Sequence, residues 1–568
     1  MRRSLRALLP AVLLLVMVST TVFGQHTMFI PKPTTLTYLD GIILGDTLSN
    51  GKRADSLRVY VLQRGGTWFW ENSVANVGWS LHIEAADTGS GTMPAIYARP
   101  VPGSSPLAVP GQLVDVEGPI YIKGLMISGY LDVDTSAFNT YGATFIFFRR
   151  GGASPDRMEF YNNVLVNSGQ AYASAFGSCK VMKFVDNKLA NDGTPPAFDL
   201  GNGRIIDCRN VGLDSLILIN NTLAYGFDRA VRHLKSVGRV DNWIVDHNTF
   251  YENGGRYGLI SLGAVGSNVQ ITNNLMIDPM AFGADTNYQR QFDFGECGEF
   301  YADGKVKMSW IYHSNINSDT LPGNKNTLWN IKHNYWYVTP QIQAVWDSAI
   351  HANWDPNIGV GRMLTDSIKA KLGADSANAF TKLTSFAFTK VPAPMTSVVL
   401  YCTMPPPNGT GGGSSGGVWP GYDHRLGAYY RDTMDCSYST SSPAYTGASG
   451  GFPAGDLNWF PTRKAAWLLT DVQQQPSSGV AEVYTLSQNY PNPFNPSTQI
   501  NFSIPKQTRV TLKVFNVLGQ EVATLVDGVL TAGQHTATFQ ATQFASGVYF
   551  YSIKAGDFAS TRKMMLVK

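Results

Sequence analysis

The chain has 568 residues, of which 44 are Lys or Arg and 41 are Asp or Glu, and its formal net charge is +3. This near balance leaves no electrostatic footprint for nucleic acid or for an anionic membrane surface, so neither is expected as a partner. Length alone predicts about four domains, but a solenoid grows by adding coils to one core. We therefore expect one long domain with accessory segments.

Residues 1–24 have the pattern of a secretory signal peptide. Three arginines precede an apolar run from Ala7 to Val18, and small or modest residues follow as far as Gly24. The apolar run is too short for a stable membrane span, and no other stretch is long and apolar enough for one. The sequence therefore predicts an exported chain that has no transmembrane segment after cleavage behind Gly24.

Residues 34–115 are expected to form an N-terminal cap and the first coils of a repeat structure. Short β-rich runs at 57–62, 67–70 and 81–85 predict strands there. The segment from Ile120 to Ile127 has the spacing of the later repeats, with Leu125 in the slot that asparagine takes in them. It is predicted to be the first regular coil.

One short pattern returns six times between residues 158 and 336. Each copy has apolar residues at positions −5, −3 and +2 around an asparagine, and the asparagines are Asn163, Asn187, Asn221, Asn248, Asn274 and Asn334. The alternation predicts a strand before each asparagine, and the asparagine, which tolerates left-handed backbone angles, predicts a corner. Units of this length without a helical segment predict a parallel β-helix. In it, a structural ladder is expected of Asn163, Asn187, Asn221, Asn248 and Asn274.

These coils, together with the run from Arg58 to Thr67 and the segment from Leu81 to Ala85, resemble the pectate-lyase-like superfamily. The resemblance covers residues 55–340 and implies an all-β, right-handed parallel β-helix over residues 25–400. That superfamily includes lyases, hydrolases, epimerases and non-enzymatic adhesins, so the resemblance implies a fold and no single chemistry.

The densest group of ionisable residues in the repeats is the candidate functional site. Its members are Asp207, Arg209, Asp228, Arg229, Arg232, His233 and Lys235. Coils of a β-helix stack about 4.8 Å apart, so charges at matching positions of neighbouring coils lie close enough to act together. Two interpretations stay open, a catalytic or binding site and a set of salt bridges on a solvated loop.

The strand before each asparagine also has an outward face, at positions −4 and −2. This face is polar at Glu159 and Lys183 but apolar in its middle, at Ile217, Ile219 and Ile244. A polysaccharide groove needs polar and ionisable groups at its centre. We therefore expect a loop to cover this sheet and any groove to lie on another face.

After the repeats, short helices are predicted at 341–349 and 366–372, the second begun by Thr365 or Asp366 as its N-cap. Residues 401–472 are expected to be a loop-rich tail on the solenoid, with a glycine-rich loop at 405–417 and with Trp459 and Phe460 as its fastening. A polar run predicts a linker at 473–483.

The cysteines are odd in number and have no metal-type spacing. They are Cys179, Cys208, Cys297, Cys402 and Cys436. In an exported chain Cys402 and Cys436 are a candidate disulfide pair, and reduced, buried cysteines are the alternative. No metal site is predicted from them.

Residues 484–568 alternate short apolar runs with Gly, Pro and Asn turns, which predicts a small immunoglobulin-like antiparallel β-sandwich. Four motifs, Asn489 to Asn495, Val517 to Val522, Gly547 to Tyr551 and Lys563 to Lys568, resemble the type A C-terminal sorting domain of the type IX secretion system. The resemblance implies engagement of the secretion machinery and a sortase, and release from or attachment to the outer-membrane surface. An immunoglobulin-like carbohydrate-associated module is the alternative.

The cargo between the two ends is expected to act on, or bind, extracellular polysaccharide. The β-helix lyases that it resembles use Arg or Lys with Ca²⁺ held by acidic residues, so a polysaccharide lyase would imply a Ca²⁺ cofactor, although the sequence lacks a compact acidic cluster. A glycoside hydrolase would need two carboxylates on facing coils. A carbohydrate-binding or adhesin-type protein would need only an aromatic-lined groove.

Overall fold

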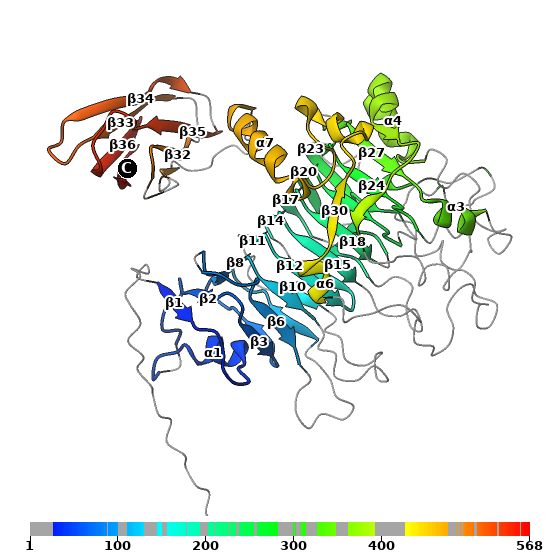
Figure 1. The fold of residues 1–568 in the computed structure, drawn as a ribbon, viewed down its shortest axis with the longest axis horizontal. Helices are drawn as coiled ribbons and strands as arrows, with labels where there is room; N and C mark the ends of the chain where they lie inside the picture. Colours follow the sequence, from blue (N-terminus) through cyan, green and yellow to red (C-terminus); the bar gives the residue numbers. More distant parts are fainter. Residues whose placement is uncertain are drawn as a thin grey trace, which may run out of the picture. The chain divides into compact units, whose positions relative to one another are not determined.

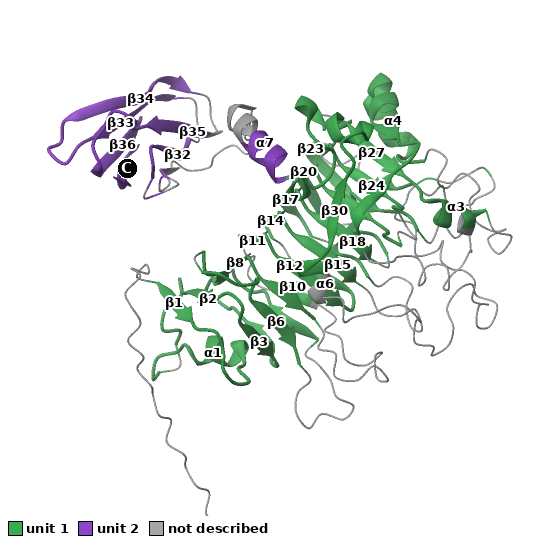
Figure 2. Ribbon diagram, viewed as in Figure 1, with its two compact units in different colours: residues 1–460 green, residues 461–568 purple. Residues whose placement is uncertain are grey.

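The computed structural model describes residues 26–567 apart from gaps, the longest of which are 100–110, 130–144, 150–155, 193–202, 282–298, 314–326, 348–361, 392–426 and 475–484. Several sequence predictions lie outside the described residues: the signal peptide, the loop at 405–417, and the positions of Lys235, Cys297 and Cys402. The chain divides into two compact units, residues 1–460 and 461–568 (Figure 2).

The first unit is a stack of coils whose strands form three parallel sheets (Figure 1). Sheet A consists of β1 Thr27–Ile30, β2 Val59–Leu62, β5 Leu81–Ala85, β8 Ile120–Lys123, β11 Arg157–Tyr161, β14 Val181–Val185, β17 Leu213–Ile219, β20 Arg239–Asp246, β23 Ala264–Thr272 and β26 Leu328–Lys332. Sheet B consists of β3 Thr67–Trp70, β6 Ala95–Ala98, β9 Met126–Ser128, β12 Val164–Ser168, β15 Lys188–Asp192, β18 Thr222–Gly226, β21 Thr249–Tyr251, β24 Leu275–Ile277, β27 Asn334–Tyr337 and β28 Phe380–Lys382.

Sheet C consists of β4 Val74–Ala75, β7 Gln112–Asp115, β10 Phe145–Arg149, β13 Ala171–Ala175, β16 Ile206–Arg209, β19 Val231–Leu234, β22 Ile260–Ser261 and β25 Ile311–Tyr312. From β8 onward each regular coil visits sheet A, then sheet B, then sheet C, and the next coil lies beside it in register. The predicted parallel β-helix is confirmed.

The apolar positions of the repeat form continuous inward columns. Met158, Met182, Leu216 and Trp243 occupy equivalent places in neighbouring strands of sheet A and are all fully buried. Five residues further along the chain, the asparagines stack at the corner to sheet B. The apolar side chain of each coil thus packs against the apolar side chains of the coils before and after it. This packing explains why positions −5 and −3 are apolar in every copy of the repeat.

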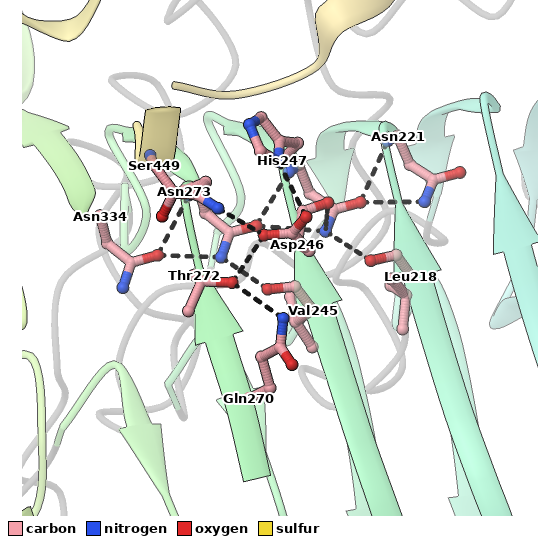
Figure 3. Close-up of polar contacts among 12 residues, drawn as sticks. Leu218, Asn221, Val245, Asp246, His247, Gln270, Thr272, Asn273, Asn334 and Ser449 are labelled. Atoms are coloured by element: carbon pink, nitrogen blue, oxygen red, sulfur yellow. Dashed lines mark hydrogen bonds and ion pairs between the residues drawn. The ribbon is translucent and has the colours of Figure 1, made fainter. Parts of the chain in front are cut away.

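The six asparagines form one hydrogen-bonded ladder. Figure 3 shows the part of it that runs from Asn221 to Asn334. Asn221, for example, donates from its backbone N–H and its side-chain amide to Oδ1 of Asn248, at 3.0 and 2.9 Å, and also donates to the carbonyl of Phe184 at 3.0 Å. The ladder asparagines are at most 1% exposed. Each one therefore ties its coil to both neighbours, and the predicted ladder is confirmed with Asn334 as its sixth member.

The left-handed backbone at this corner belongs to the residue before each ladder asparagine and not to the asparagine itself, so that part of the prediction was wrong. The left-handed residues, with φ between 51° and 64°, are Asn162, Asp186, Asn220, His247, Asn273 and His333. In the first regular coil Gly124 takes this place, immediately before Leu125. The ladder asparagine is needed for its amide, which satisfies backbone groups of the neighbouring coil.

Both ends of the solenoid carry short helices. Helix α1 (Leu39–Gly45) lies at the N-terminal end, where Trp68, Trp70 and Trp79 are buried in the core. Near the last coils are α3 (Pro340–Trp346), α4 (Asp366–Leu372) and the 3₁₀ segment η6 (Gly373–Asn378). The hydroxyl of Thr365 accepts from the backbone N–H of Ile368, which confirms Thr365 as the N-cap of α4.

A second layer lies on sheet B and is built from the end of the first unit. We call residues 427–460 the tail; its elements are α6 Gly427–Asp432, β30 Asp435–Tyr438, η9 Pro443–Thr446, η10 Ser449–Gly451 and η11 Leu457–Trp459, and β30 pairs with β29 Phe388–Lys390. Asp456 accepts from the hydroxyl of Thr222 at 2.8 Å, and the indole N–H of Trp459 donates to the same hydroxyl at 2.8 Å. Phe460 packs against Tyr438 and Tyr445 of the tail itself.

The second unit contains α7 (Pro461–Gln474) and an antiparallel β-sandwich. One sheet has β31 Thr485–Leu486, β32 Ser497–Ile504 and β35 Gly533–Gln540, and the other has β34 Glu521–Leu530, β33 Thr508–Phe515, β36 Gly547–Ala555 and β37 Phe558–Leu566. The core between them includes Phe502, Leu512 and Ile553. The predicted sandwich is confirmed. Across the described residues of both units, no helix combines the length and the apolar character that crossing a bilayer requires.

Candidate functional site

The predicted site centres on a carboxylate in sheet C. Asp207 of β16 and Arg232 of β19 are register partners, and Nε and Nη2 of Arg232 donate to the two oxygens of Asp207 at 2.7 and 2.9 Å. Arg209 donates a further hydrogen bond to Asp207 Oδ2 at 2.9 Å, and Nη1 of Arg204 lies 3.6 Å from the same oxygen. Asp207 thus faces three guanidinium groups.

A second carboxylate extends this network at the turn from sheet B to sheet C. Asp228 Oδ2 accepts from Nε of Arg204 at 2.9 Å and lies 3.4 Å from Nε of Arg229. Nη1 of Arg229 donates to the hydroxyl of Tyr312 at 2.6 Å. Arg204 therefore bridges the two carboxylates. Sequence reasoning missed it, although it lies three residues before Asp207.

The structure brings together five of the seven predicted residues, Asp207, Arg209, Asp228, Arg229 and Arg232, and with Arg204 we call them the arginine cluster. Both carboxylates are fully buried, and only Arg209 has an appreciable exposed fraction, 28% of its side chain. The expectation of salt bridges on a solvated loop was therefore wrong about the solvent. The residues lie on strands and turns of the solenoid, and all of them except Arg209 are buried.

His233 does not belong to this cluster. It follows Arg232 in β19, and successive strand residues point to opposite faces, so its ring lies in the solenoid interior with Nε2 2.7 Å from the carbonyl of Val211. A Cβ on Gly263 would come within 2.1 Å of its Nδ1, which shows how closely the backbone encloses the ring. Burial lowers the pKa of His233, which favours the neutral ring. Lys235 lies outside the described residues.

The electrostatics of the cluster favour a permanent ion network. Burial alone would raise the pKa of Asp207, but Arg232 and Arg204 outweigh burial and hold that pKa far below its usual range. An enclosed carboxylate that stays ionised cannot exchange a proton with a polymer outside. Within the described part of the chain, no group of three or more His, Cys, Asp or Glu residues could hold a metal ion, so the described residues offer no such group for the Ca²⁺ that a lyase would use.

A different group of side chains lies partly exposed on the outward face of sheet A. We call it the sheet A strip; its members are His82 and Glu84 of β5, Tyr121 and Lys123 of β8, Glu159 and Tyr161 of β11, and Lys183 of β14. The ring centroids of His82 and Tyr121 are 4.4 Å apart, and those of Tyr121 and Tyr161 are 5.1 Å apart. Three rings from three successive strands thus form a continuous aromatic row.

Charged groups surround this row. Glu159 accepts from the hydroxyl of Tyr161 at 2.9 Å and from Arg157 at 2.5 Å, and His82 Nε2 lies 3.1 Å from Glu84 Oε2. Burial, with the charges of Glu84 and Glu159, raises the pKa of Tyr121 to about 12. Burial lowers the pKa of Lys183, whose ammonium lies 5.5 Å from the ring centroid of Tyr161.

A loop was expected to cover this face because its middle is apolar, and for the N-terminal half of the face that expectation is wrong. The side chains of Glu84 and His82 are 22% and 27% exposed, so the described residues leave this half of the face partly open. That expectation used only the coils that end in asparagine. In the coil that carries Leu125, the same outward positions, four and two residues before Leu125, are Tyr121 and Lys123. The face that a segment does cover is sheet B, beneath the tail.

In the second unit, residues of two of the C-terminal motifs, Asn489 and Tyr551, bond to each other: the backbone N–H of Asn489 donates to the hydroxyl of Tyr551 at 2.7 Å. The side-chain amide of Asn489 also donates to the hydroxyl of Thr498. Residues 488–568 match the family described as the secretion system C-terminal sorting domain. The β-sandwich is a C-terminal sorting domain. The sorting domain indicates type IX secretion, and the protein is secreted or attached to the cell surface. None of the curated proteins matches the chain.

Proposed function

We propose that the solenoid binds an extracellular polysaccharide along the sheet A strip. The observation that carries the proposal is the aromatic row of His82, Tyr121 and Tyr161, flanked by ionisable groups on the same face. Aromatic rings provide flat apolar surfaces for sugar rings, and charged side chains around them fix hydroxyl groups by hydrogen bonding.

The shape of the strip favours a polymer over a small ligand. Its members come from four adjacent strands, β5, β8, β11 and β14, which are spaced about 4.8 Å apart, so the strip extends about 14 Å along the solenoid axis. Its charges are mixed, with Glu84 and Glu159 beside Lys123 and Lys183. A mixed row of this kind suits a hydroxyl-rich chain better than a uniformly charged one.

Binding without turnover is the activity that the described geometry supports best. The arginine cluster contains most of the residues predicted to be catalytic, but its two carboxylates are buried and hydrogen-bonded to guanidinium groups. One observation favours a second candidate, glycoside hydrolysis: Glu84 and Glu159 both act on Tyr121 from strands on either side of β8. Two carboxylates flanking a sugar-binding position are what glycoside hydrolysis requires.

The test uses the purified mature protein and a panel containing pectin, alginate and neutral polysaccharides. Binding is measured by affinity electrophoresis, and turnover is followed through reducing ends and the absorbance of unsaturated uronides. Tyr121→Ala and Tyr161→Ala should weaken binding about tenfold or more, since each removes one ring of the row. Tyr337→Ala, a partly buried tyrosine on sheet B, is the matched control and should bind like wild type.

The outcomes separate the candidates. Binding without new reducing ends supports the adhesin-type function. New reducing ends that are absent with Glu159→Gln support hydrolysis at the sheet A strip. Unsaturated products that are absent with Arg232→Ala would instead indicate a lyase site at the arginine cluster of sheet C. If no polymer on the panel binds, or if both Tyr→Ala variants bind as wild type does, the proposal for the strip is wrong.

A further inference from the structure

We propose that one end of the sorting domain docks into an apolar cleft on a protein of the type IX secretion machinery. The docking surface consists of the turn at Val517 and Leu518 and of the end of β37. This inference is independent of polysaccharide binding, because the solenoid and the sorting domain are separate units. It rests on where the four motifs of the sorting domain meet, on exposed apolar side chains there and on the fixed shape of one turn.

Strand register brings the motifs together at one end of the four-stranded sheet. β33 ends at Phe515, which pairs with Phe550 of β36, and Phe550 pairs with Lys563 of β37. The end of β33, the beginning of β36 and the end of β37 therefore lie at the same end of the sheet, which we call the motif end. The first motif reaches it as well, because Asn492 accepts from the backbone N–H of Met565 at 2.8 Å. All four motifs thus contribute to one region of the domain.

The motif end gathers exposed apolar side chains. Among the described residues of the second unit, six large apolar side chains are exposed, and four of them lie at this end. These four are Val517, Leu518, Met565 and Val567, which are 66%, 79%, 40% and 48% exposed. Met565 precedes the buried Leu566 in β37, so it lies on the outer face of the sheet. Apolar side chains that gather at one exposed place are typical of an interaction site.

The turn that carries two of these side chains is held in one shape by its polar residues. Oδ1 of Asn516 accepts from the backbone N–H groups of Leu518 and Gln520, both at 3.0 Å, and the amide of Asn516 donates to the side chain of Gln520 at 2.9 Å. Gly519 has a left-handed φ of 75°. These contacts use no side-chain atom of Val517 or Leu518. A preordered turn loses little conformational entropy when its apolar side chains are buried in a partner.

The charges at the base of the turn favour an apolar partner surface. Glu521 is the register partner of Phe515, and its Oε2 lies 2.8 Å from Nζ of Lys513. This ion pair balances its own charge, so the turn presents apolar side chains and no net charge. The sorting domain engages the type IX secretion machinery, which supplies the partner. An apolar cleft on one of its proteins is the surface that complements two exposed aliphatic side chains.

The experiment expresses the full chain in a bacterium that has a type IX secretion system. The fraction of the chain that reaches the cell surface is measured by fractionation and by surface protease treatment. For the double variant Val517→Ser, Leu518→Ser, this fraction should fall at least about tenfold, because two apolar contacts with the partner are lost. The withheld chain should accumulate in the periplasm.

Two controls isolate the apolar contact. Val529 is 61% exposed and pairs with Arg509 near the opposite end of the same sheet, so Val529→Ser should be exported like wild type. The double variant Val517→Ile, Leu518→Met keeps apolar side chains in the turn and should also be exported like wild type.

Thermal denaturation of the purified full chain tests whether the variants fold. Val517 and Leu518 are largely exposed, so the Tm of the double serine variant should stay within about 2 °C of wild type. Met565→Gln covers the case in which that variant does not fold, because glutamine has nearly the shape of methionine and the backbone bond to Asn492 is kept. It should lower surface delivery about threefold or more.

Three results would overturn the proposal. The first is normal surface delivery of the folded serine or glutamine variants. The second is an equal loss of delivery in Val529→Ser, which would indicate a general effect of polar substitution on the domain. The third is a wild-type dimer that the double serine variant does not form while its export is unchanged, which would assign the motif end to self-association.

Discussion

Two neighbouring residues have separate roles at the corner between sheets A and B. The first adopts left-handed angles that turn the chain, and the second, the ladder asparagine, ties the coil to its neighbours. The first position accepts Asn, Asp or His, because short polar side chains tolerate this region. The second is asparagine in six coils, because both an amide donor and a carbonyl acceptor are needed there.

The ladder asparagine should therefore be sensitive to substitution in its own right. Asn221→Leu removes two donated side-chain hydrogen bonds and leaves the amide groups of Asn187 without their acceptor, so we expect a loss of about 1–3 kcal/mol in the free energy of unfolding. Urea denaturation measures it. Asn242→Leu is the control, because Asn242 donates one hydrogen bond to Asp214 at the surface. Equal losses in the two variants would contradict the ladder's role.

Asp278 should make stability depend on pH. Burial raises its pKa from 3.8 to about 7, although it accepts hydrogen bonds from the backbone and hydroxyl of Thr339. Below pH 3.8 both states hold the proton. As pH rises the unfolded state loses it first, so stability falls until about pH 7, by at most about 4 kcal/mol.

Asp278→Asn should remove this decline, because asparagine keeps an acceptor for Thr339 and tolerates the left-handed φ of 49°. Its urea midpoint should exceed that of wild type at pH 8, and the advantage should vanish near pH 4. Parallel pH profiles for the two proteins would show that Asp278 does not titrate as described.

At the scale of elements, the solenoid is closed differently on each face. Sheet B lies beneath the tail, whose Asp456 and Trp459 both bond to Thr222, while the sheet A strip stays partly open. The sequence could locate Trp459 as an attachment because a large aromatic in a glycine-rich segment needs a surface to pack on. It could not show which sheet the tail covers, since that depends on contacts more than 200 residues apart in the chain.

Trp459→Ala should loosen the tail without melting the coils. The substitution removes the hydrogen bond to Thr222 and the contact with Lys188, whose ammonium lies 4.2 Å from the indole centroid. Hydrogen exchange should rise in η11 and in β18, while β16 and β19 of sheet C stay protected. The expected cost is about 3 kcal/mol, typical of Trp→Ala truncation. Leu328→Ala, at a side chain that is 71% exposed, should leave the pattern unchanged.

At the scale of the whole molecule, the cargo and its address are separate units of the chain. The solenoid and the sorting domain each have their own core. Repeats and short motifs are local in sequence, which is why the β-helix, the ladder and the sorting domain were predictable. The residues of the candidate site were not predictable in the same way, because they depend on which side chains of different coils come into contact. Arg204 meets Asp228, which lies 24 residues away in the chain, and Tyr121 meets His82, which lies 39 residues away.

Deleting residues 484–568 should stop the protein before the cell surface. The sorting domain directs type IX secretion, so the truncated chain is expected to stay in the periplasm with its solenoid folded. Fractionation with an antibody against the solenoid measures this, and surface protease treatment should spare the truncated chain. A deletion of residues 475–483 alone, which keeps the sorting domain, is the control. Surface display of the truncated chain would contradict the assignment.

The tail has a consequence for the order in which the chain folds. Each coil of the solenoid contacts its immediate neighbours, so the coils can form one after another from contacts of modest sequence separation. The tail instead joins Asp456 to Thr222, 234 positions earlier in the chain, and it needs several finished coils of sheet B to dock on. Loop closure over that distance is slow, so we expect the tail to dock late in folding.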